Sequence, residues 1–140
     1  MENLQQKTLT IEPAGKGAWY PAAEKFLAEA MQVDPLAGVE QLRRLCHNGE
    51  AMLYIIKADS YMVAAFVLRV EQKPNGAEGV IVAAGGSLPG VNLMRATLGS
   101  IEKIFKGCDS IRVHVTRKGL MRQFARAGYA AREVVFTKAV

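Results

Sequence analysis

Apolar positions in the first fifty residues follow one short alternating stretch and then two helical repeats. The alternation at Thr8 to Ile11 predicts an opening strand. From Pro21 onward, apolar residues recur at helical spacing, and Asp34-Pro35 then supplies an N-cap and a proline suited to the first helical position. We therefore expect two consecutive helices, the second ending near residue 48, before Gly49.

The middle of the chain changes to β-branched and aromatic runs. Residues 52–57 and 61–71 predict a hairpin, because the polar segment between them suits a tight turn. Lys73-Pro74-Asn75-Gly76 is the strongest turn signal in the chain, and residues 79–84 beyond it predict a third strand with both faces buried. The three strands should form an antiparallel meander.

The second half predicts helix and strand in alternation. Apolar residues repeat at steps of 3 and 4 from Val91 to Phe105, and Gly107 stops the pattern. A strand is expected over residues 110–115, a short helix over 118–127 and a final strand over 133–138. The predicted order is β-αα-βββ-α-β-α-β, in one domain over residues 1–140.

This order fixes the fold class. One full helix joins the strand at 79–84 to the strand at 110–115, so the two should run parallel through a right-handed crossover. The sheet is therefore mixed, in an α/β domain.

Composition indicates a folded chain, and charge indicates an anionic partner. Half of the residues are hydrophobic and 22% are charged, which is enough apolar surface to offset chain entropy. The sequence contains neither a secretory signal nor a membrane span, and we expect a cytoplasmic protein. Net charge is +5, yet residues 101–140 carry 9 basic and 3 acidic side chains. This excess favours a phosphorylated cofactor, nucleic acid or an acidic protein, with a solvated basic face as the alternative.

Cysteine and histidine content predicts no metal site. The two cysteines, Cys46 and Cys108, lack the paired spacing of zinc ligands, and only His47 and His114 accompany them. Both cysteines are expected to be packing residues.

The glycine-rich segment Gly85 to Gly90 lies where a strand should feed a helix N-terminus. Free N–H groups and the helix dipole favour anions at such a place. One interpretation is a phosphate cradle with Ser87 as N-cap or hydroxyl donor. The other is a turn that needs glycine for its backbone angles.

Two segments match a known family, Gly90-Val91-Asn92-Leu93 at the start of the long helix and Phe124-Ala125-Arg126-Ala127-Gly128-Tyr129 at the end of the short one. With these segments and its order of elements, the chain resembles the GCN5-related N-acetyltransferase (GNAT) superfamily over nearly its whole length. The resemblance implies a sheet that opens between the strands at 79–84 and 110–115. The resemblance implies acetyl-coenzyme A as cofactor, a small-molecule or peptide amine as acceptor, and direct acyl transfer in which backbone N–H groups of residues 83–90 hold the thioester and pyrophosphate. The residues it implies for cofactor binding are Val82, Ala83, Ala84, Gly85, Gly86, Ser87, Gly90, Val91, Arg117 and Lys118.

Three positions depart from that family's pattern. Gly85 stands where a basic or amide residue is usual, and Leu88 stands at the first loop glycine. The neighbouring Pro89 contributes no N–H, so the loop offers fewer donors and the expectation of coenzyme A binding is weakened. Phe124 replaces the tyrosine that protonates the departing thiolate. A second hypothesis follows, a catalytically inactive relative that acts as a binding or assembly protein, such as a homodimer or a small viral, phage or bacterial structural component.

No catalytic residue is assigned, although weak candidates exist. His114 has a side chain suited to a general base, and Glu71 with Glu78 flanks the turn at 73–76; each is also explained as a solvated surface group. Phe124 is a candidate only by position. The helix at 118–127 carries Lys118, Arg122 and Arg126 on one face, which suits an anion or simply a solvated stripe. Nucleic-acid binding is disfavoured, because aromatic residues are not interleaved with these cations.

Overall fold

The computed structural model describes residues 8–31, 34–115, 118–132 and 136–140, and a twisted five-stranded sheet forms its centre. The strands lie in chain order across the sheet. The first four are antiparallel to their neighbours, and the last is parallel to the fourth. They are β1 (Leu9–Pro13), β2 (Met52–Ala58), β3 (Tyr61–Lys73), β4 (Gly76–Gly86) and β5 (Ser110–Val113). The predicted mixed α/β sheet is confirmed.

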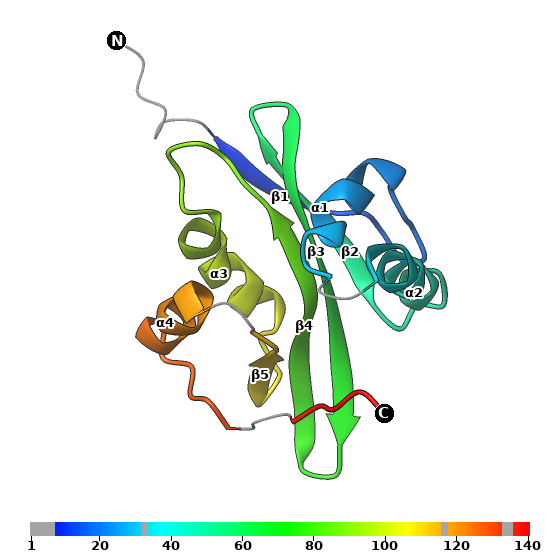
Figure 1. The fold of residues 1–140 in the computed structure, drawn as a ribbon. Coiled ribbons are helices and arrows are strands. Elements are labelled where there is room, and N and C mark those ends of the chain that lie inside the picture. Colours follow the sequence, from blue (N-terminus) through cyan, green and yellow to red (C-terminus); the bar gives the residue numbers. More distant parts are fainter. Residues whose placement is uncertain (1–7, 32–33, 116–117, 133–135) are drawn as a thin grey trace.

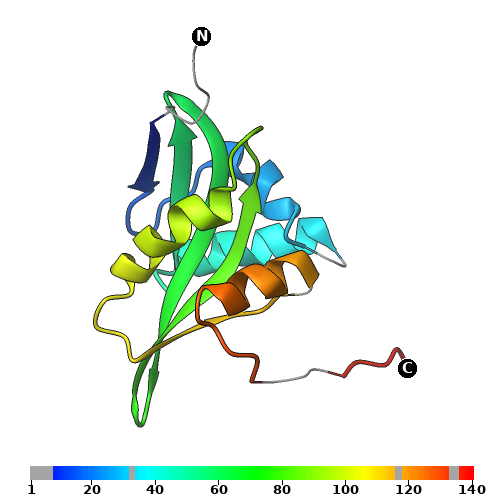
Figure 2. The same ribbon diagram turned by 90° about the vertical axis from the view of Figure 1, so that its left-hand side faces the viewer.

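Helices cover both faces of this sheet (Figures 1 and 2). The short 3-10 helix η2 and helices α1 and α2 lie on one face, and α3 and α4 lie on the other. Their bounds are Pro21–Ala23 for η2, Glu24–Ala28 for α1, Pro35–His47 for α2, Leu93–Ile104 for α3 and Lys118–Arg126 for α4. None of the helices within the described ranges has the length and apolar character to cross a membrane.

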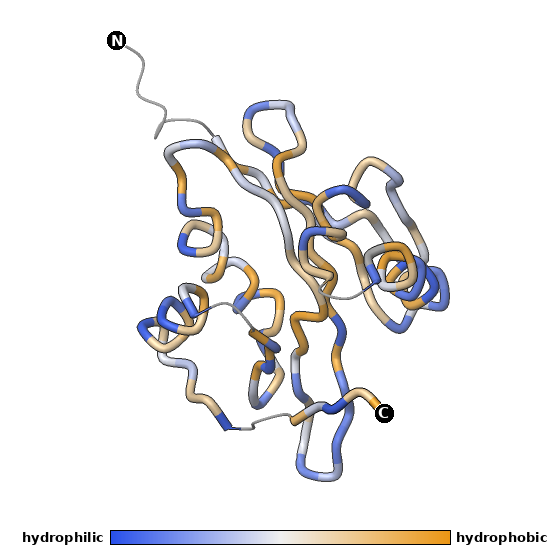
Figure 3. Tube along the Cα trace, in the orientation of Figure 1, coloured by the Kyte–Doolittle hydropathy of each residue, from blue (hydrophilic) through white to orange (hydrophobic). Residues whose placement is uncertain are grey.

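Each face of the sheet has its own hydrophobic core. Leu27 of α1 and Leu53 and Val67 of the sheet are fully buried in the first core. Phe66 and Ile101 belong to the second, beneath α3 and α4. Figure 3 shows hydrophobic residues along the central strands, whereas the far end of the β3–β4 hairpin is hydrophilic. Alternation along the strands therefore supplies two cores, one for each helical layer.

Local signals act largely as predicted at the second helix. The Asp34 side chain accepts a hydrogen bond from the N–H of Ala37 (3.2 Å), as an N-cap does. Gly49, beyond the C-terminus, has φ of 77°. The first predicted helix is shorter than its apolar pattern, because a 3-10 turn takes its first three residues and α1 ends at Ala28.

The predicted final strand over residues 133–138 is not found in the described part of the tail. Residues 133–135 lie outside the described residues, and residues 136–138 are irregular. The side chain of Phe136 is 91% exposed, so its apolar character is not used in a core. The apolar residues of this segment therefore do not form a strand in its described part.

A β-bulge interrupts the pairing of β3 with β4. Val67 pairs with Ala83, whereas the next residue, Leu68, pairs with Ile81. Val82 is thus an extra residue in β4, which bends that strand locally. The parallel pairing of β4 with β5 also ends here, since Ile81 and Val113 form its last pair. The sheet opens between β4 and β5 from this point, as predicted.

Helix α1 packs directly on the end of β4. A Cβ atom built on Gly85 would stand 1.9 Å from the carbonyl oxygen of Phe26, which is backbone and has little freedom to move. The next residue, Gly86, has φ of 134° and lies against Ala64 of β3. Glycine is therefore needed at position 85 for the close approach of the α1 backbone, and at position 86 for the positive φ angle.

Replacing Gly85 by alanine should therefore destabilise the protein, by about 1–3 kcal/mol as expected for overpacking. Gly99 is the matched control, because it lies within α3 and a Cβ atom there would meet nothing within 4 Å. Gly99→Ala should stabilise by about 1 kcal/mol through helix propensity. Urea unfolding of both variants measures the difference, and equal stabilities would contradict the packing argument.

Candidate functional site

The end of β4 presents main-chain groups that no strand uses. Ser87 donates its N–H to the carbonyl of Val63 (3.2 Å), so residues 83, 85 and 87 face β3. Ala84 and Gly86 therefore direct their N–H and C=O groups to the opposite edge. Beyond Val113, the described part of the chain places no strand on that edge. Ala84 is also exposed, and it lies where the sheet opens.

The loop that follows contains a tight turn. Val91 donates to the carbonyl of Leu88 (3.1 Å), with Pro89 and Gly90 as the central residues and φ of 77° at Gly90. This is the geometry of a type II turn, which favours proline and then glycine at those positions. The predicted loop Gly85 to Gly90 thus needs correction: its first two residues belong to β4, and the turn explains Gly90.

Helix α3 is capped by Asn92, so Ser87 is not its N-cap, which was one of the two roles that the phosphate-cradle interpretation allowed for Ser87. The Asn92 side chain accepts from the N–H of Arg95 (3.1 Å) and donates to Gln123 of α4 (3.2 Å). Ser87 does not cap the helix because the Leu88–Val91 turn separates it from the helix start.

Four N–H groups at this helix start have no acceptor within the described chain, those of Gly90, Asn92, Leu93 and Met94. A phosphate group can accept from free donors at a helix N-terminus, and the exposed Ser87 hydroxyl lies in the same loop. The residues present therefore fit a pyrophosphate, with fewer loop donors than an all-glycine loop would offer.

The other predicted cofactor residues are distributed over different environments. Val82 and Ala83 face the core shared with α1 and α2. Lys118 is exposed at the first position of α4, whereas Arg117 lies outside the described residues. Val91 is half-buried in the turn. Of the three residues Val82, Ala83 and Ala84, the exposed Ala84 is therefore the one that offers a free main-chain edge.

Phe124 lies within the core beneath α4, at 9% exposure. The Tyr129 ring packs edge-on against it, with ring centroids 5.1 Å apart. The Tyr129 hydroxyl donates to Glu102 of α3 (2.8 Å), and burial, together with that carboxylate, raises the pKa of Tyr129. This hydroxyl is therefore protonated and already hydrogen-bonded.

Glu71 and Glu78 belong to an ion cluster at the far end of the sheet. Arg112 of β5 donates to Glu71 (2.8 Å) and to Glu78 (3.0 Å). Lys73 pairs with Glu78 (2.8 Å), and Arg69 pairs with Glu71 (2.8 Å). The hydrogen bond from Lys73, aided by Arg112, lowers the pKa of Glu78. These carboxylates hold β3, β4 and β5 together, and a lowered pKa makes Glu78 a weaker base.

His114 and the cysteines have simple surroundings. His114 is exposed just after β5, while Val113 and Val115 on either side of it pack against the core beneath α3. Cys46 is buried, and burial raises its pKa to about 11, so its thiol is a packing group. Cys108 packs against the other core. Within the described ranges, no three potential ligands gather to hold a metal ion.

The basic side chains of α4 remain a separate surface. Lys118, Arg122 and Arg126 are exposed, and among the described residues none of them forms an ion pair. The buried Phe124 faces the core from the opposite side of the helix.

Comparison with known proteins identifies the fold. No family model matches the sequence, nor does any curated protein. Solved structures do match: a GCN5-related N-acetyltransferase from Ralstonia eutropha JMP134 aligns with a TM-score of 0.70 and 15% identity over 94% of this chain and 99% of that one. Glucosamine-6-phosphate N-acetyltransferase from Arabidopsis thaliana aligns at 0.65 and 15% over 95% and 99%. An acetyltransferase from Trypanosoma brucei aligns at 0.65 and 17% over 95% and 100%.

The resemblance found in the sequence is thus confirmed for the fold, which is that of the GNAT acetyltransferases. The shared architecture extends over nearly the whole chain, whereas identity is too low to carry over individual residue roles.

Because the folded state lowers the pKa of Glu78, its contribution to stability is present above the ordinary value of 4.5 and is lost as pH falls below it. Glu78→Gln should therefore be less stable at pH 7 and lose less stability on acidification from pH 5 to 3. Thermal unfolding across this range measures both effects. Glu50→Gln, at an exposed loop position, is the control and should retain the wild-type pH dependence.

Proposed function

We propose that this protein is an N-acetyltransferase, which transfers an acetyl group from acetyl-coenzyme A to an amine by direct attack. The observation that carries the proposal is the opening between β4 and β5, whose unpaired edge at Ala84 and Gly86 leads to the free donors at the start of α3. The fold shared with acetyltransferases supports it.

Cofactor binding rests on main-chain donors in this proposal. The N–H groups of Gly90, Leu93 and Met94 hold the pyrophosphate at the positive end of the α3 dipole. Lys118, at the start of α4, supplies a cation for a further phosphate. The pantetheine arm lies along the open edge of β4, where it exchanges hydrogen bonds with Ala84 and Gly86 as a strand would.

The proposed reaction needs no enzyme nucleophile. The acceptor nitrogen attacks the thioester carbon, a C–N bond forms as the C–S bond breaks, and the thiolate leaves. The Ala84 N–H donates to the carbonyl oxygen, on which negative charge develops. His114 takes the proton that the amine loses, which remains a prediction from its exposure and its place after β5. Phe124 offers no proton to the thiolate, so departure is unassisted at that position.

Leu93→Pro tests the donor set at the start of α3. Proline is tolerated at the first helical position, and the preceding Asn92 has extended backbone angles (φ −84°, ψ 95°) that suit it. The change removes one main-chain N–H and keeps α3 intact. Loss of one hydrogen bond to a charged group should weaken acetyl-coenzyme A binding by roughly 10- to 100-fold, as measured by calorimetric titration.

Leu93→Ala is the matched control, since it shortens the same side chain and keeps the N–H; it should bind as the wild type does. When acetyl-coenzyme A is present at 100 times its dissociation constant, the wild-type protein should gain about 2.7 kcal/mol of stability. Its melting temperature should then rise by several degrees. If millimolar acetyl-coenzyme A produces no binding heat and no thermal shift, the enzyme proposal is contradicted. The inactive, partner-binding relative is then the remaining hypothesis.

Phe124→Tyr tests the missing acid. A hydroxyl at the ring position implied by the resemblance should protonate the departing thiolate and raise turnover by about tenfold or more, with little change in cofactor affinity. Tyr129→Phe is the control, because that hydroxyl donates to Glu102 and its loss should not alter turnover. Acetyl transfer to a panel of amines, followed by thiol release, measures both; unchanged turnover in Phe124→Tyr would show that this ring is remote from the thiolate.

A further inference from the structure

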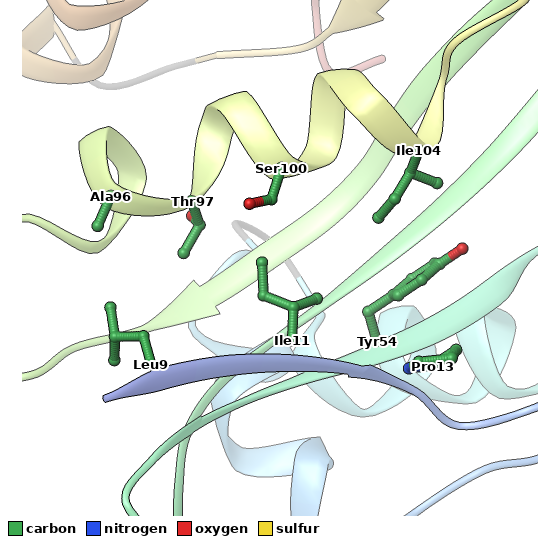
Figure 4. Close-up of a pocket in the computed structure, with 8 residues that line it drawn as sticks. All are labelled: Leu9, Ile11, Pro13, Tyr54, Ala96, Thr97, Ser100 and Ile104. Atoms are coloured by element: carbon green, nitrogen blue, oxygen red, sulfur yellow. The ribbon is translucent and has the colours of Figure 1, made fainter. Parts of the chain in front are cut away.

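A hollow of about 490 Å³ lies between α3 and β1 (Figure 4). Figure 2 shows that β1 lies on the side of α3 away from β5. Its floor is apolar: Figure 4 shows Leu9 and Ile11 directed from β1 toward α3, and Ile104 above Tyr54. A second hollow of about 340 Å³ shares Leu9 and Ala96 with it and extends the groove to the start of α3. The groove therefore runs along β1 for the length of that strand.

The strand that borders this groove has one unpaired edge. β1 lies at the edge of the sheet. Ala14 donates to Leu53 (2.9 Å) and Asp59 donates to Thr8 (3.0 Å), so the even-numbered residues of β1 exchange their hydrogen bonds with β2. Leu9 and Ile11 consequently direct their N–H and C=O groups outward. Within the described chain no strand pairs with them, which leaves two donors and their carbonyls on the edge.

The same two residues thus serve both features. Their side chains form the floor of the groove, while their main-chain groups form the adjacent hydrogen-bonding edge. An alkyl chain would fill the floor and leave the edge unsatisfied, whereas an extended peptide satisfies both. Pro13 has no N–H, so an added strand can pair only as far as the Ile11 donor and the Pro13 carbonyl.

Charge around the groove selects among peptides. Arg95 lines the second hollow, and Lys103 follows Ser100, which lines the first hollow, by three residues along α3. Two nearby carboxylates already have partners: Glu12 pairs with Lys57 (3.2 Å), and Glu102 accepts from Tyr129. The rim is therefore cationic and complements a peptide that carries carboxylates.

We propose that β1 and α3 form a docking site for an extended acidic peptide segment of a partner protein, with apolar side chains at alternate positions. The segment adds as a sixth strand beside β1, and its apolar side chains enter the groove beneath Ala96, Ser100 and Ile104. The first hollow is lined by no residue of β4 or β5, whereas the second borders Gly90 and Asn92 at the start of α3. Strand addition at Leu9 and Ile11 uses only the edge of β1, so it does not depend on acetyl transfer.

Amide hydrogen exchange of the full chain tests the edge directly. In the free protein, the amides of Leu9 and Ile11 should exchange fast, whereas those of Thr10 and Glu12 should be protected by β2. The probe is a capped nine-residue peptide that alternates valine with glutamate or threonine. Its binding should slow exchange at Leu9 and Ile11 at least tenfold. Protection at both residues before any peptide is added would overturn the proposal, because a second copy or the chain itself would then cover the edge.

Two comparisons separate edge pairing from simple apolar contact. Two methylated peptides are compared, one N-methylated at the odd-numbered amides and one at the even-numbered amides. The peptide whose methyl groups block the amides facing β1 should not bind, whereas the other should bind as the unmodified peptide does. Ser100→Glu places a carboxylate in the groove and should weaken binding at least tenfold by fluorescence anisotropy. Gln41→Glu adds the same charge at an exposed position of α2, on the other face of the sheet, and should not. The proposal is contradicted if both methylated peptides bind equally well, or if the peptide binds equally well to both protein variants. It is also contradicted if the unmodified peptide does not bind at millimolar concentration.

Discussion

The unequal pairing of β4 shapes the part of this molecule that can meet a ligand. Its antiparallel pairing with β3 continues to Gly86, while its parallel pairing with β5 stops at Ile81, one residue before the bulge at Val82. The five residues beyond that point are supported on one side only. Their free edge, the turn that follows and the start of α3 all take their positions from this difference in strand length.

The sequence predicted the architecture well because its strongest signals are local. Turn residues, the Asp34 cap and helical spacing depend on a few neighbours, and the parallel relation of β4 and β5 follows from the single helix between them. The final predicted strand had no comparable support, and its described part, which includes Phe136, is irregular and exposed. A run of apolar and β-branched residues does not by itself form a strand.

The candidate site was less predictable, because its features depend on contacts between distant segments. Gly85 is required by the backbone of α1, about sixty residues earlier in the chain, and nothing near Gly85 indicates this. The bulge at Val82 arises from register with β3, and Asn92 takes the cap because a turn separates Ser87 from the helix. Phe124 is the reverse case: the resemblance marked its position from sequence, and the structure adds that the nearby Tyr129 hydroxyl is held by Glu102.

The order of contacts along the chain also bears on how the protein folds. The β2–β3 and β3–β4 hairpins close through neighbouring residues, such as Ala58 with Tyr61, whereas Ser110 of β5 meets Glu78 across 32 residues. Loop closure of that length is costly and slow, so the three-stranded meander should form first and β5 should dock afterwards. The opening between β4 and β5 is then a late product of folding, and the ion cluster around Arg112 acts mainly on the rate at which the assembled sheet comes apart.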